Sequence, residues 1–271
     1  KHYKLRITSH SSRFINRSRT VTLHTIDSKS LNSNQFLLWL NNPKIELLLD
    51  KIWEKSVPLG KIAEIWNGLN IQKLPIFSDY PDSEYILPCV MGRDINHYNI
   101  KNMRYAKLTD NIAKSLVMFN KPKIVAQDIV SYAQHPKPHI KIISAIDREN
   151  RLNVSTVTNI TSAEYNLEYL CGILNSRFIS WYAYNFIYNR ASRTMHFRSG
   201  YADQIPICRI ENNDSENIRL HDELVKLINQ ITSKYNDDIS DICSRIESIV
   251  YQLYGITDDE LRLLEQLTGF Y

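Results

Sequence analysis

The stretch of sequence best suited to chemistry is basic and aromatic, and it has no acidic residue between Glu168 and Asp203. It ends in the loop NRASRTMHFRSGY, which follows a long run of apolar residues. Arginine forms bidentate hydrogen bonds with guanine O6 and N7 or with phosphate, and aromatic rings stack on exposed bases. We therefore predict nucleic-acid contacts from three arginines of this loop: Arg190, Arg193 and Arg198.

Two further polar clusters could read bases. One surrounds Gly68, and the other spans 121–141, where lysines alternate with polar residues. Asn and Gln side chains pair bidentately with adenine N6 and N7, and lysines neutralise phosphates. The residues that we select as DNA-binding candidates from these clusters are Asn67, Asn70, Gln72, Lys73, Lys123, Gln127 and Lys137.

The sequence has no motif that would supply catalysis or hold a metal. None of its seven glycines is spaced to form a P-loop or a G-x-G-x-x-G phosphate cradle, and the glycine-rich turn of a common S-adenosylmethionine site is absent. The pair Asp27-x-Lys29 lacks the preceding carboxylate of a nuclease site. His135 and His139 are separated by two prolines, which prevent a helix from placing both rings on one face. We predict no catalytic and no metal-binding residue.

The net charge of +4 conceals a strong asymmetry along the chain. Residues 1–141 have 21 Lys and Arg against 11 Asp and Glu, whereas residues 201–271 have 6 against 14. This division favours a body that faces a polyanion and a solvated acidic end, although lysines that only increase solubility would give the same balance. The four isolated cysteines fit free thiols in a reducing cytoplasm, and no apolar run is long enough to span a membrane.

Hydrophobic periodicity predicts an α+β fold, with a mixed or antiparallel β core of a recognition domain, flanking helices and a C-terminal helical segment. We divide the chain into an N-terminal basic segment with helices (1–57), a recognition domain (58–210) and a C-terminal helical segment (211–271). Expected strands cover 20–26, 61–66, 84–91, 123–130, 140–146 and 154–160. Expected helices cover 34–40, 43–55, 166–187, 218–235 and 237–254, and a capping box at Thr257 and Glu260 opens a last short helix.

Six phrases resemble, in the same order, the TaqI-like C-terminal specificity domain, and together they cover about residues 35–265. This domain is the target-recognition part of adenine-specific DNA methyltransferases and of single-chain type II restriction–modification enzymes. The phrase ILPCVMGRDINHY adds Arg93 to the DNA-binding candidates. The family's loop near Gly68 often has two glycines, whereas this sequence has one. The phrases are IAEIWNGLN (62–70), ILPCVMGRDINHY (86–98), KPKIVAQDIV (121–130), NLEYLCGILNSRFISWYA (166–183), ADQIPI (202–207) and VYQLYGITDDE (250–260).

The resemblance implies a chain that binds double-stranded DNA in the cytoplasm and reads a specific sequence. The family's catalytic Asn-Pro-Pro-Tyr/Phe motif is absent, and the nearest string is Asn42-Pro43-Lys44. Since the chain also begins at Lys1, we expect it to be the recognition part of a longer enzyme. The methyltransferase domain of that parent would bind S-adenosylmethionine and flip the target adenine, and a nuclease domain would use Mg²⁺.

Three other interpretations remain open. The first is a module like a type I restriction specificity subunit, which usually has two recognition domains separated by long helices. The second is a protein-interaction module that uses the acidic C-terminal helices without binding DNA. The third is a stand-alone enzyme with an unfamiliar site, for which the sequence gives no positive indication.

Overall fold

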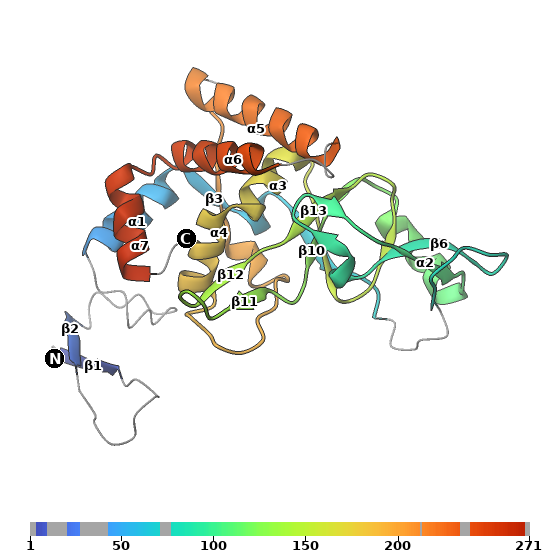
Figure 1. Cartoon of the computed structure of the whole chain (residues 1–271), viewed down its shortest axis with the longest axis horizontal. Coiled ribbons are helices and arrows are strands. Elements are labelled where there is room, and N and C mark those ends of the chain that lie inside the picture. Colours follow the sequence, from blue (N-terminus) through green and yellow to red (C-terminus); the bar gives the residue numbers. More distant parts are fainter. Residues whose placement is uncertain are drawn as a thin grey trace. The chain divides into compact units, whose positions relative to one another are not determined.

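A computed structural model describes residues 4–9, 21–27, 43–70, 77–211, 213–233 and 239–268. The chain forms two compact units, Lys1–Glu54 and Lys55–Tyr271. The larger unit contains β-sheets and helices in the α+β arrangement predicted from the sequence, which is confirmed (Figure 1). No helix among these described ranges is long and apolar enough to cross a membrane.

The smaller unit contains a β-hairpin and a helix. Strand β1 (Lys4–Ser9) pairs antiparallel with β2 (Val21–Asp27), as the alternating pattern of residues 20–26 predicts. Helix α1 (Pro43–Glu54) begins at a proline, which has no backbone N–H to leave unsatisfied in a first turn. It buries Ile45, Leu48 and Ile52, which helical spacing places on one face. The helix predicted for 34–40 lies outside the described residues.

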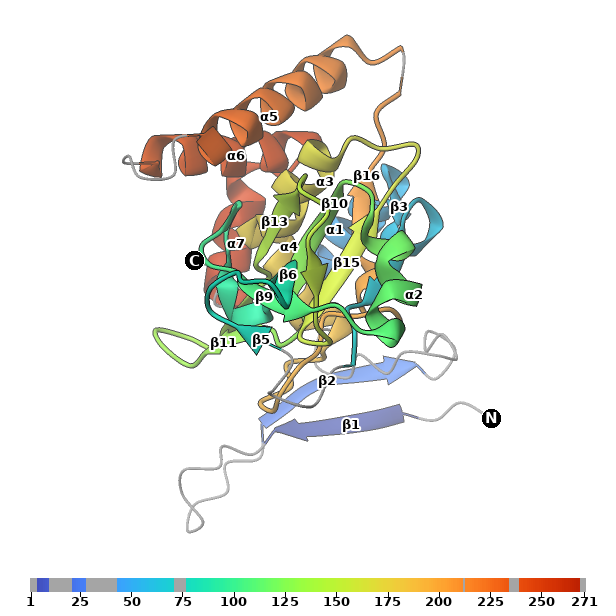
Figure 2. The same cartoon turned by 90° about the vertical axis from the view of Figure 1, so that its right-hand side faces the viewer.

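The main sheet of the larger unit has four strands in the order β13-β10-β15-β4, all antiparallel to their neighbours (Figure 2). Their residues are Ser144–Asp147 in β13, Lys123–Gln127 in β10, Val157–Thr161 in β15 and Glu64–Asn67 in β4. The predicted strands at 61–66, 123–130 and 154–160 are therefore confirmed in place, although each observed strand is shorter or shifted by a few residues.

Each face of the main sheet is covered. Helix α3 (Leu167–Asn175) packs against β13 and β10. Elsewhere in the main sheet, Val125, Ala145 and Val157 form a buried cluster with Val90 and Ile95, which precede the sheet's central strand in the sequence. Burial on both faces explains the continuous apolar run of Ile124, Val125 and Ala126 in the central strand β10.

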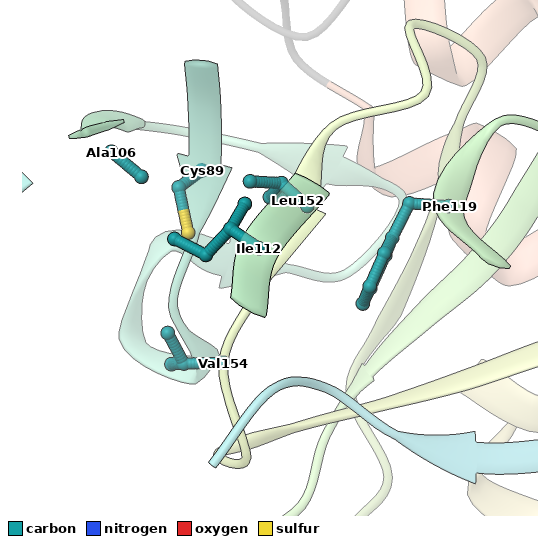
Figure 3. Close-up of a cluster of buried hydrophobic side chains, with 6 residues drawn as sticks. All are labelled: Cys89, Ala106, Ile112, Phe119, Leu152 and Val154. Carbon is teal, nitrogen blue, oxygen red and sulfur yellow. The ribbon is translucent and has the colours of Figure 1, made fainter. Parts of the chain in front are cut away.

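A second sheet has the order β14-β6-β9-β5 and includes one parallel pair, β14 with β6. Its strands are Leu152–Asn153 (β14), Tyr85–Val90 (β6), Arg104–Lys107 (β9) and Phe77–Ser78 (β5). Helix α2 (Asp110–Phe119) supplies Ile112 and Phe119 to the core beneath it, together with Cys89 and Leu152 (Figure 3). This helix was not among the predicted elements, although Thr109 is a typical N-cap and accepts a hydrogen bond from Ile112 N.

The single helix predicted for 166–187 is wrong, because Ser176 interrupts it. Ser176 is extended, with φ −69° and ψ 149°, and its hydroxyl caps the next helix by accepting from Ile179 N at 3.2 Å. The segment therefore consists of α3, α4 (Arg177–Tyr182) and a π-helical turn at Ala183–Ile187. The predicted strand 140–146 is similarly divided into β12 (His139–Lys141) and β13, and β12 forms a hairpin with β11 (Ser131–Ala133).

Three helices close the chain, as predicted. They are α5 (Ser215–Ser233), α6 (Ser240–Leu253) and α7 (Asp258–Thr268). Helix α5 packs on α3 and α6. The capping box is confirmed, since Glu260 N donates to Thr257 Oγ1 at 3.3 Å and Thr257 N donates to Glu260 Oε2 at 2.8 Å.

Short elements complete the larger unit. Strand β3 (Ser56–Pro58) pairs with β16 (Pro206–Cys208). Strands β7 (Ile95–Asn96) and β8 (Asn99–Ile100) form a hairpin. Single 3₁₀ turns lie at Leu59–Lys61, Gly92–Asp94 and Ala202–Gln204. The domain boundaries at 57/58 and 210/211 stay predictions.

Candidate nucleic-acid interface

Three strands of the main sheet place polar residues at one edge. Because neighbouring strands are antiparallel, β10 and β4 end where β15 begins. Asn67 pairs with Thr158 in the register, and Asp128 directly follows Gln127 at the end of β10. Residues distant in the sequence are thus brought to the same end of the sheet.

At this sheet end, Asp128 is the centre of a hydrogen-bonded group that we call the Asp128 cluster: Asn67, Asp128, Thr158, His196 and Arg198. Asp128 Oδ1 accepts from Arg198 Nε at 2.9 Å and Oδ2 accepts from Arg198 Nη2 at 2.5 Å. Asn67 Nδ2 donates to Asp128 Oδ1 at 3.3 Å and to Thr158 Oγ1 at 3.2 Å. The cluster therefore joins all three polar regions that we selected from the sequence, through Asn67, Asp128 and Arg198.

The Asp128 carboxyl is held in its charged form. Burial by itself would raise the pKa of Asp128, but hydrogen bonds from Arg198 and His196 outweigh this effect and bring the pKa below its ordinary value. His196 Nδ1 lies 2.7 Å from Asp128 Oδ2. The negative charge of Asp128 thus lies beside the guanidinium of Arg198 and the imidazole of His196.

The loop that carries the arginines is attached to the same strand end. Val130 N donates to Met195 O at 3.0 Å, and Phe197 N donates to Asp128 O at 2.6 Å. Upstream, Asn189 and Arg190 both have positive φ, 49° and 54°, which reverses the chain after the π-helical turn. The two backbone hydrogen bonds hold the arginine loop against the segment that follows β10.

Arg190 and Arg193 differ in their surroundings. Arg190 Nε donates to Asn185 Oδ1 at 2.9 Å, and partial burial lowers the pKa of its guanidinium. Arg193 is exposed in the middle of the loop. Arg193 is therefore placed to meet a ligand from solvent, whereas Arg190 is already bonded within the protein.

Arg93 and Gln127 also lie at this end of the sheet. Gly92 N donates to Thr156 Oγ1 at 3.0 Å, and Asp128 N donates to Thr156 O at 3.0 Å, so Thr156 joins the turn that carries Arg93 to the Asp128 cluster. Arg93 is exposed. Gln127 is half-buried, and its Nε2 donates to Ile95 O at 2.8 Å. The side-chain NH2 group of Gln127 thus already donates inside the protein.

The loop at Gly68 approaches the protein backbone closely. A Cβ at Gly68 would lie 2.3 Å from Val154 O and 2.3 Å from Asn153 Oδ1, so only glycine fits there. Leu69 N donates to Asn153 O at 2.9 Å, and the next residue, Asn70, is exposed. Gln72 and Lys73 lie outside the described residues.

The structure corrects the prediction for Lys123. This lysine is fully buried at the start of β10, at the end of the strand opposite Gln127, and cannot contact DNA. Its Nζ donates to Asp147 Oδ2 at 2.7 Å and to Phe119 O at 3.2 Å. A buried ammonium needs such partners, and the pair serves the core.

Lys137 is exposed but is not joined to the Asp128 cluster by any contact recorded for the described chain. It lies between β11 and β12, and its Nζ donates to Glu265 O of α7 at 3.2 Å. The same hairpin supplies His135 and His139 to a cavity of about 660 Å³ that is also lined by Trp181 and Glu247. Among the residues that the structure describes, no group of three or more His, Cys, Asp or Glu could hold a metal ion.

The DNA-binding candidates selected from the sequence do not include Asp128, Thr156, Thr158 or His196. The predicted strand 123–130 placed Asp128 inside the strand, whereas β10 ends at Gln127 and Asp128 directly follows it. Thr156 and Thr158 flank the start of β15 and have no distinctive local pattern. Only the strand register shows that they meet Asp128.

The geometry defines an α+β domain with a polar, arginine-bearing sheet end. Residues 87–207 match the family described as the TaqI-like C-terminal specificity domain. The resemblance is confirmed over that range, which includes Arg93, Asp128 and Arg198 but not Asn67. No curated protein matches the chain.

Three solved structures are similar to the chain at low sequence identity. The type IIG restriction endonuclease BpuSI has a TM-score of 0.48 at 9% identity, over 79% of this chain and 34% of BpuSI. The HsdS subunit from Thermoanaerobacter tengcongensis has 0.32 at 10%, over 78% of this chain and 51% of HsdS. The type I restriction–modification S subunit from M. genitalium has 0.37 at 12%, over 80% and 51%. The chain thus spans about a third to a half of these proteins.

Proposed function

We propose that this chain recognises a specific DNA sequence as the target-recognition part of a restriction–modification system. The family match over residues 87–207 is the observation that carries the proposal. The structure adds a physical basis, because residues that could contact DNA lie at one end of the main sheet. Arg93 and Arg193 supply positive charge there, Arg198 supplies a guanidinium paired with Asp128, and Asn67 and Gln127 supply side-chain amides.

In the finer form of this proposal, the parent is a site-specific adenine-N6 DNA methyltransferase or a fused restriction–modification enzyme that acts on DNA in the cytoplasm. The methyltransferase domain of the parent would be the partner of this chain. S-adenosylmethionine, and any Mg²⁺, would be bound by that other part, because the sequence has no glycine-rich phosphate cradle. Calorimetric titration of this chain with S-adenosylmethionine should give no heat of binding, and clear micromolar binding would contradict this assignment.

Nonspecific affinity for DNA provides the first test. Fluorescence anisotropy would compare a random-sequence DNA duplex with an RNA duplex of equal length while the salt concentration rises. For about five phosphate contacts, the slope of log K against log salt for DNA should be about −4 or steeper. Salt-sensitive binding that prefers DNA would support the proposal. Binding to neither duplex would favour a protein-interaction module.

Matched arginine variants locate the phosphate contacts. Arg193→Ala removes an exposed arginine of the loop, and its slope should become shallower by about 1. Arg262→Ala removes an arginine whose side chain is 66% exposed on the acidic helix α7, and it should leave the slope unchanged. Equal effects of both variants would place the DNA elsewhere.

A type I specificity-subunit-like module is the second candidate. Helix α5 has 19 residues and packs against α6, and such a helix pair could form the start of a spacer. Co-purification of the chain with a separately encoded methyltransferase subunit would favour this candidate. A methyltransferase domain in the same polypeptide would favour the first.

A further inference from the structure

Asp128 holds Arg198 by one edge of its guanidinium. The carboxylate oxygens accept from Nε at 2.9 Å and from Nη2 at 2.5 Å, so the Nε–Nη2 edge is occupied. The Asp128 side chain is 3% exposed and the Arg198 side chain is 43% exposed. Arg198 is therefore anchored on its inner edge while much of the side chain remains accessible.

The opposite edge of this guanidinium retains donors. Nη1 makes no hydrogen bond that the structure records with any described residue. His196 Nδ1 lies 2.6 Å from Nη2 and 2.7 Å from Asp128 Oδ2, so these three atoms form a nearly equilateral triangle. One ring nitrogen cannot both accept from Nη2 and donate to Oδ2, and we assign the His196 Nδ1 hydrogen to Asp128 Oδ2, which leaves the second hydrogen of Nη2 for the outer edge.

The charge of the pair distinguishes two uses of such an arginine. A phosphate contact works chiefly through net positive charge, and the ionised Asp128 cancels most of the charge of Arg198. A base contact depends on the direction of two donors, which a fixed guanidinium supplies at a lower entropy cost than a free side chain. The arrangement of Asp128 and Arg198 therefore suits base reading better than phosphate neutralisation.

The backbone on both sides of this pair is also fixed. Asp128 N donates to Thr156 O at 3.0 Å, and its carbonyl accepts from Phe197 N at 2.6 Å. Arg198 O accepts from Tyr201 N at 3.0 Å. The guanidinium thus starts from a rigid base, as direct readout of a base edge requires.

We propose that Arg198 reads a guanine in the major groove, with the Nη1–Nη2 edge donating to guanine O6 and N7, and that Asp128 is the positioning residue that holds this edge outward. This inference rests on the proposed DNA recognition and specifies a base and a residue pair for it. Bidentate pairing with O6 and N7 is the commonest specific contact of arginine with a base. Neither residue undergoes any covalent change.

The test is a selection from DNA duplexes with a short randomised segment, followed by sequencing of the bound pool. The full chain should enrich a motif with guanine at one defined position. Arg198→Ala should lose that guanine preference about ten- to a hundredfold while keeping the rest of the motif, and the charge-conserving Arg198→Lys should weaken it, because an ammonium lacks the fixed fork of two donors. Asp128→Asn should weaken the preference at the same position, which a purely structural loss would not do. Arg193→Ala is the matched control and should lower affinity for all sequences alike.

Each other outcome has a defined meaning. A motif that Arg198→Ala and Arg198→Lys leave unchanged would overturn the guanine assignment but not DNA recognition. A uniform loss of affinity with a shallower salt slope in Arg198→Ala would make Arg198 a phosphate contact, and this result would also overturn the guanine assignment. No enriched motif with the wild-type chain would instead contradict the proposed function itself. If Asp128→Asn fails to fold, as circular dichroism would show, Arg198→Lys still decides the base assignment.

Discussion

The side-chain amides of Asn153 and Asn159 form a reciprocal hydrogen-bonded pair behind the Gly68 loop. Asn153 Nδ2 donates to Asn159 Oδ1 at 2.6 Å, and Asn159 Nδ2 donates back to Asn153 Oδ1 at 2.9 Å. Both residues are buried, at 1% and 0% exposure. The pair therefore joins strands β14 and β15 and supports the loop that leads from Asn67 to Asn70.

Replacing either Asn153 or Asn159 should lower the free energy of unfolding by more than half of what replacing both would. In Asn159→Ala, the amide of Asn153 loses its partner without access to water, and the free energy of unfolding should fall by about 2 kcal/mol. The double variant with Asn153→Ala should be less destabilised than the sum of the two single variants. Urea denaturation would measure all three, with the exposed Asn70→Ala as a control that changes stability by less than about 0.5 kcal/mol. Strict additivity would contradict the pairing.

Gly68→Ala should displace the loop at Gly68, between Asn67 and Asn70. The new Cβ would meet backbone atom Val154 O at 2.3 Å, and a backbone contact cannot be relieved by rotating a side chain. We expect a loss of about 1–3 kcal/mol in unfolding free energy and weaker binding of the selected DNA motif.

Gly172→Ala in α3 is the matched control for this substitution. Its Cβ would meet the flexible end of Leu224 at 2.8 Å, and alanine favours a helix interior over glycine by about 1 kcal/mol. It should therefore alter stability less than Gly68→Ala and should not alter DNA binding. An equal loss in both variants would show that loop geometry is not the cause.

Lys123→Met should destabilise the fold, because it leaves the fully buried Asp147 carboxylate without the ammonium 2.7 Å away. Asp147 keeps a longer contact to Arg151 Nη1 at 3.2 Å, so we expect a loss of roughly 3 kcal/mol. Lys121→Met breaks an exposed pair with Glu64 at 3.0 Å and should cost less than about 1 kcal/mol. Thermal unfolding of both variants would test the comparison, and a mild effect at Lys123 would contradict the buried pair.

Glu247→Gln should stabilise the protein near neutral pH. Burial raises the pKa of Glu247, against the effect of the hydrogen bond from Arg177 N at 2.8 Å. Oε2 is buried and has no hydrogen-bond partner among the described residues. The folded protein thus favours the protonated form of Glu247. The contribution of this group to the free energy of unfolding is fully present below its ordinary pKa, and it is lost as the pH rises through the raised pKa of the folded state.

The comparison of Glu247→Gln with the wild type should therefore depend on pH. The variant should be more stable than the wild type near pH 7, and the difference should disappear toward about pH 4. Chemical denaturation across this range would measure it. Glu216→Gln is a control, because the hydrogen bond from Arg219 lowers the pKa of Glu216. This variant should be less stable than the wild type at neutral pH, which is the opposite of the effect expected for Glu247→Gln. A variant of Glu247 that is less stable at neutral pH would show that the carboxylate is charged and needed.

Local patterns predicted many elements because those elements depend on nearby residues. Helix α1 follows from Pro43 and an apolar face, and the start of α7 follows from the Thr257 and Glu260 capping box. The strand runs around 64–67, 123–127 and 157–161 could be recognised from β-branched and apolar residues alone. The break at Ser176 was missed, because an apolar run hides a single extended residue.

The candidate interface was predictable only as a set of regions. Sequence indicated the loops near Asn67, Gln127 and Arg198, since polar and basic residues gather there. It could not show that Lys123 turns inward, because a lysine in a strand is exposed or buried according to what packs on it. It also gave no reason to connect Arg198 with Asp128, 70 residues away.

The sequence by itself determined the α+β composition, the family resemblance and the lack of a glycine-rich phosphate cradle, because each of these depends on residue types and short-range spacing. Only the tertiary structure decided which cationic side chains are exposed to solvent and which are bound internally. The physical reason is that strand register brings the ends of β4, β10 and β15 together, and burial there determines whether a charged side chain pairs with a carboxylate or remains open to a ligand.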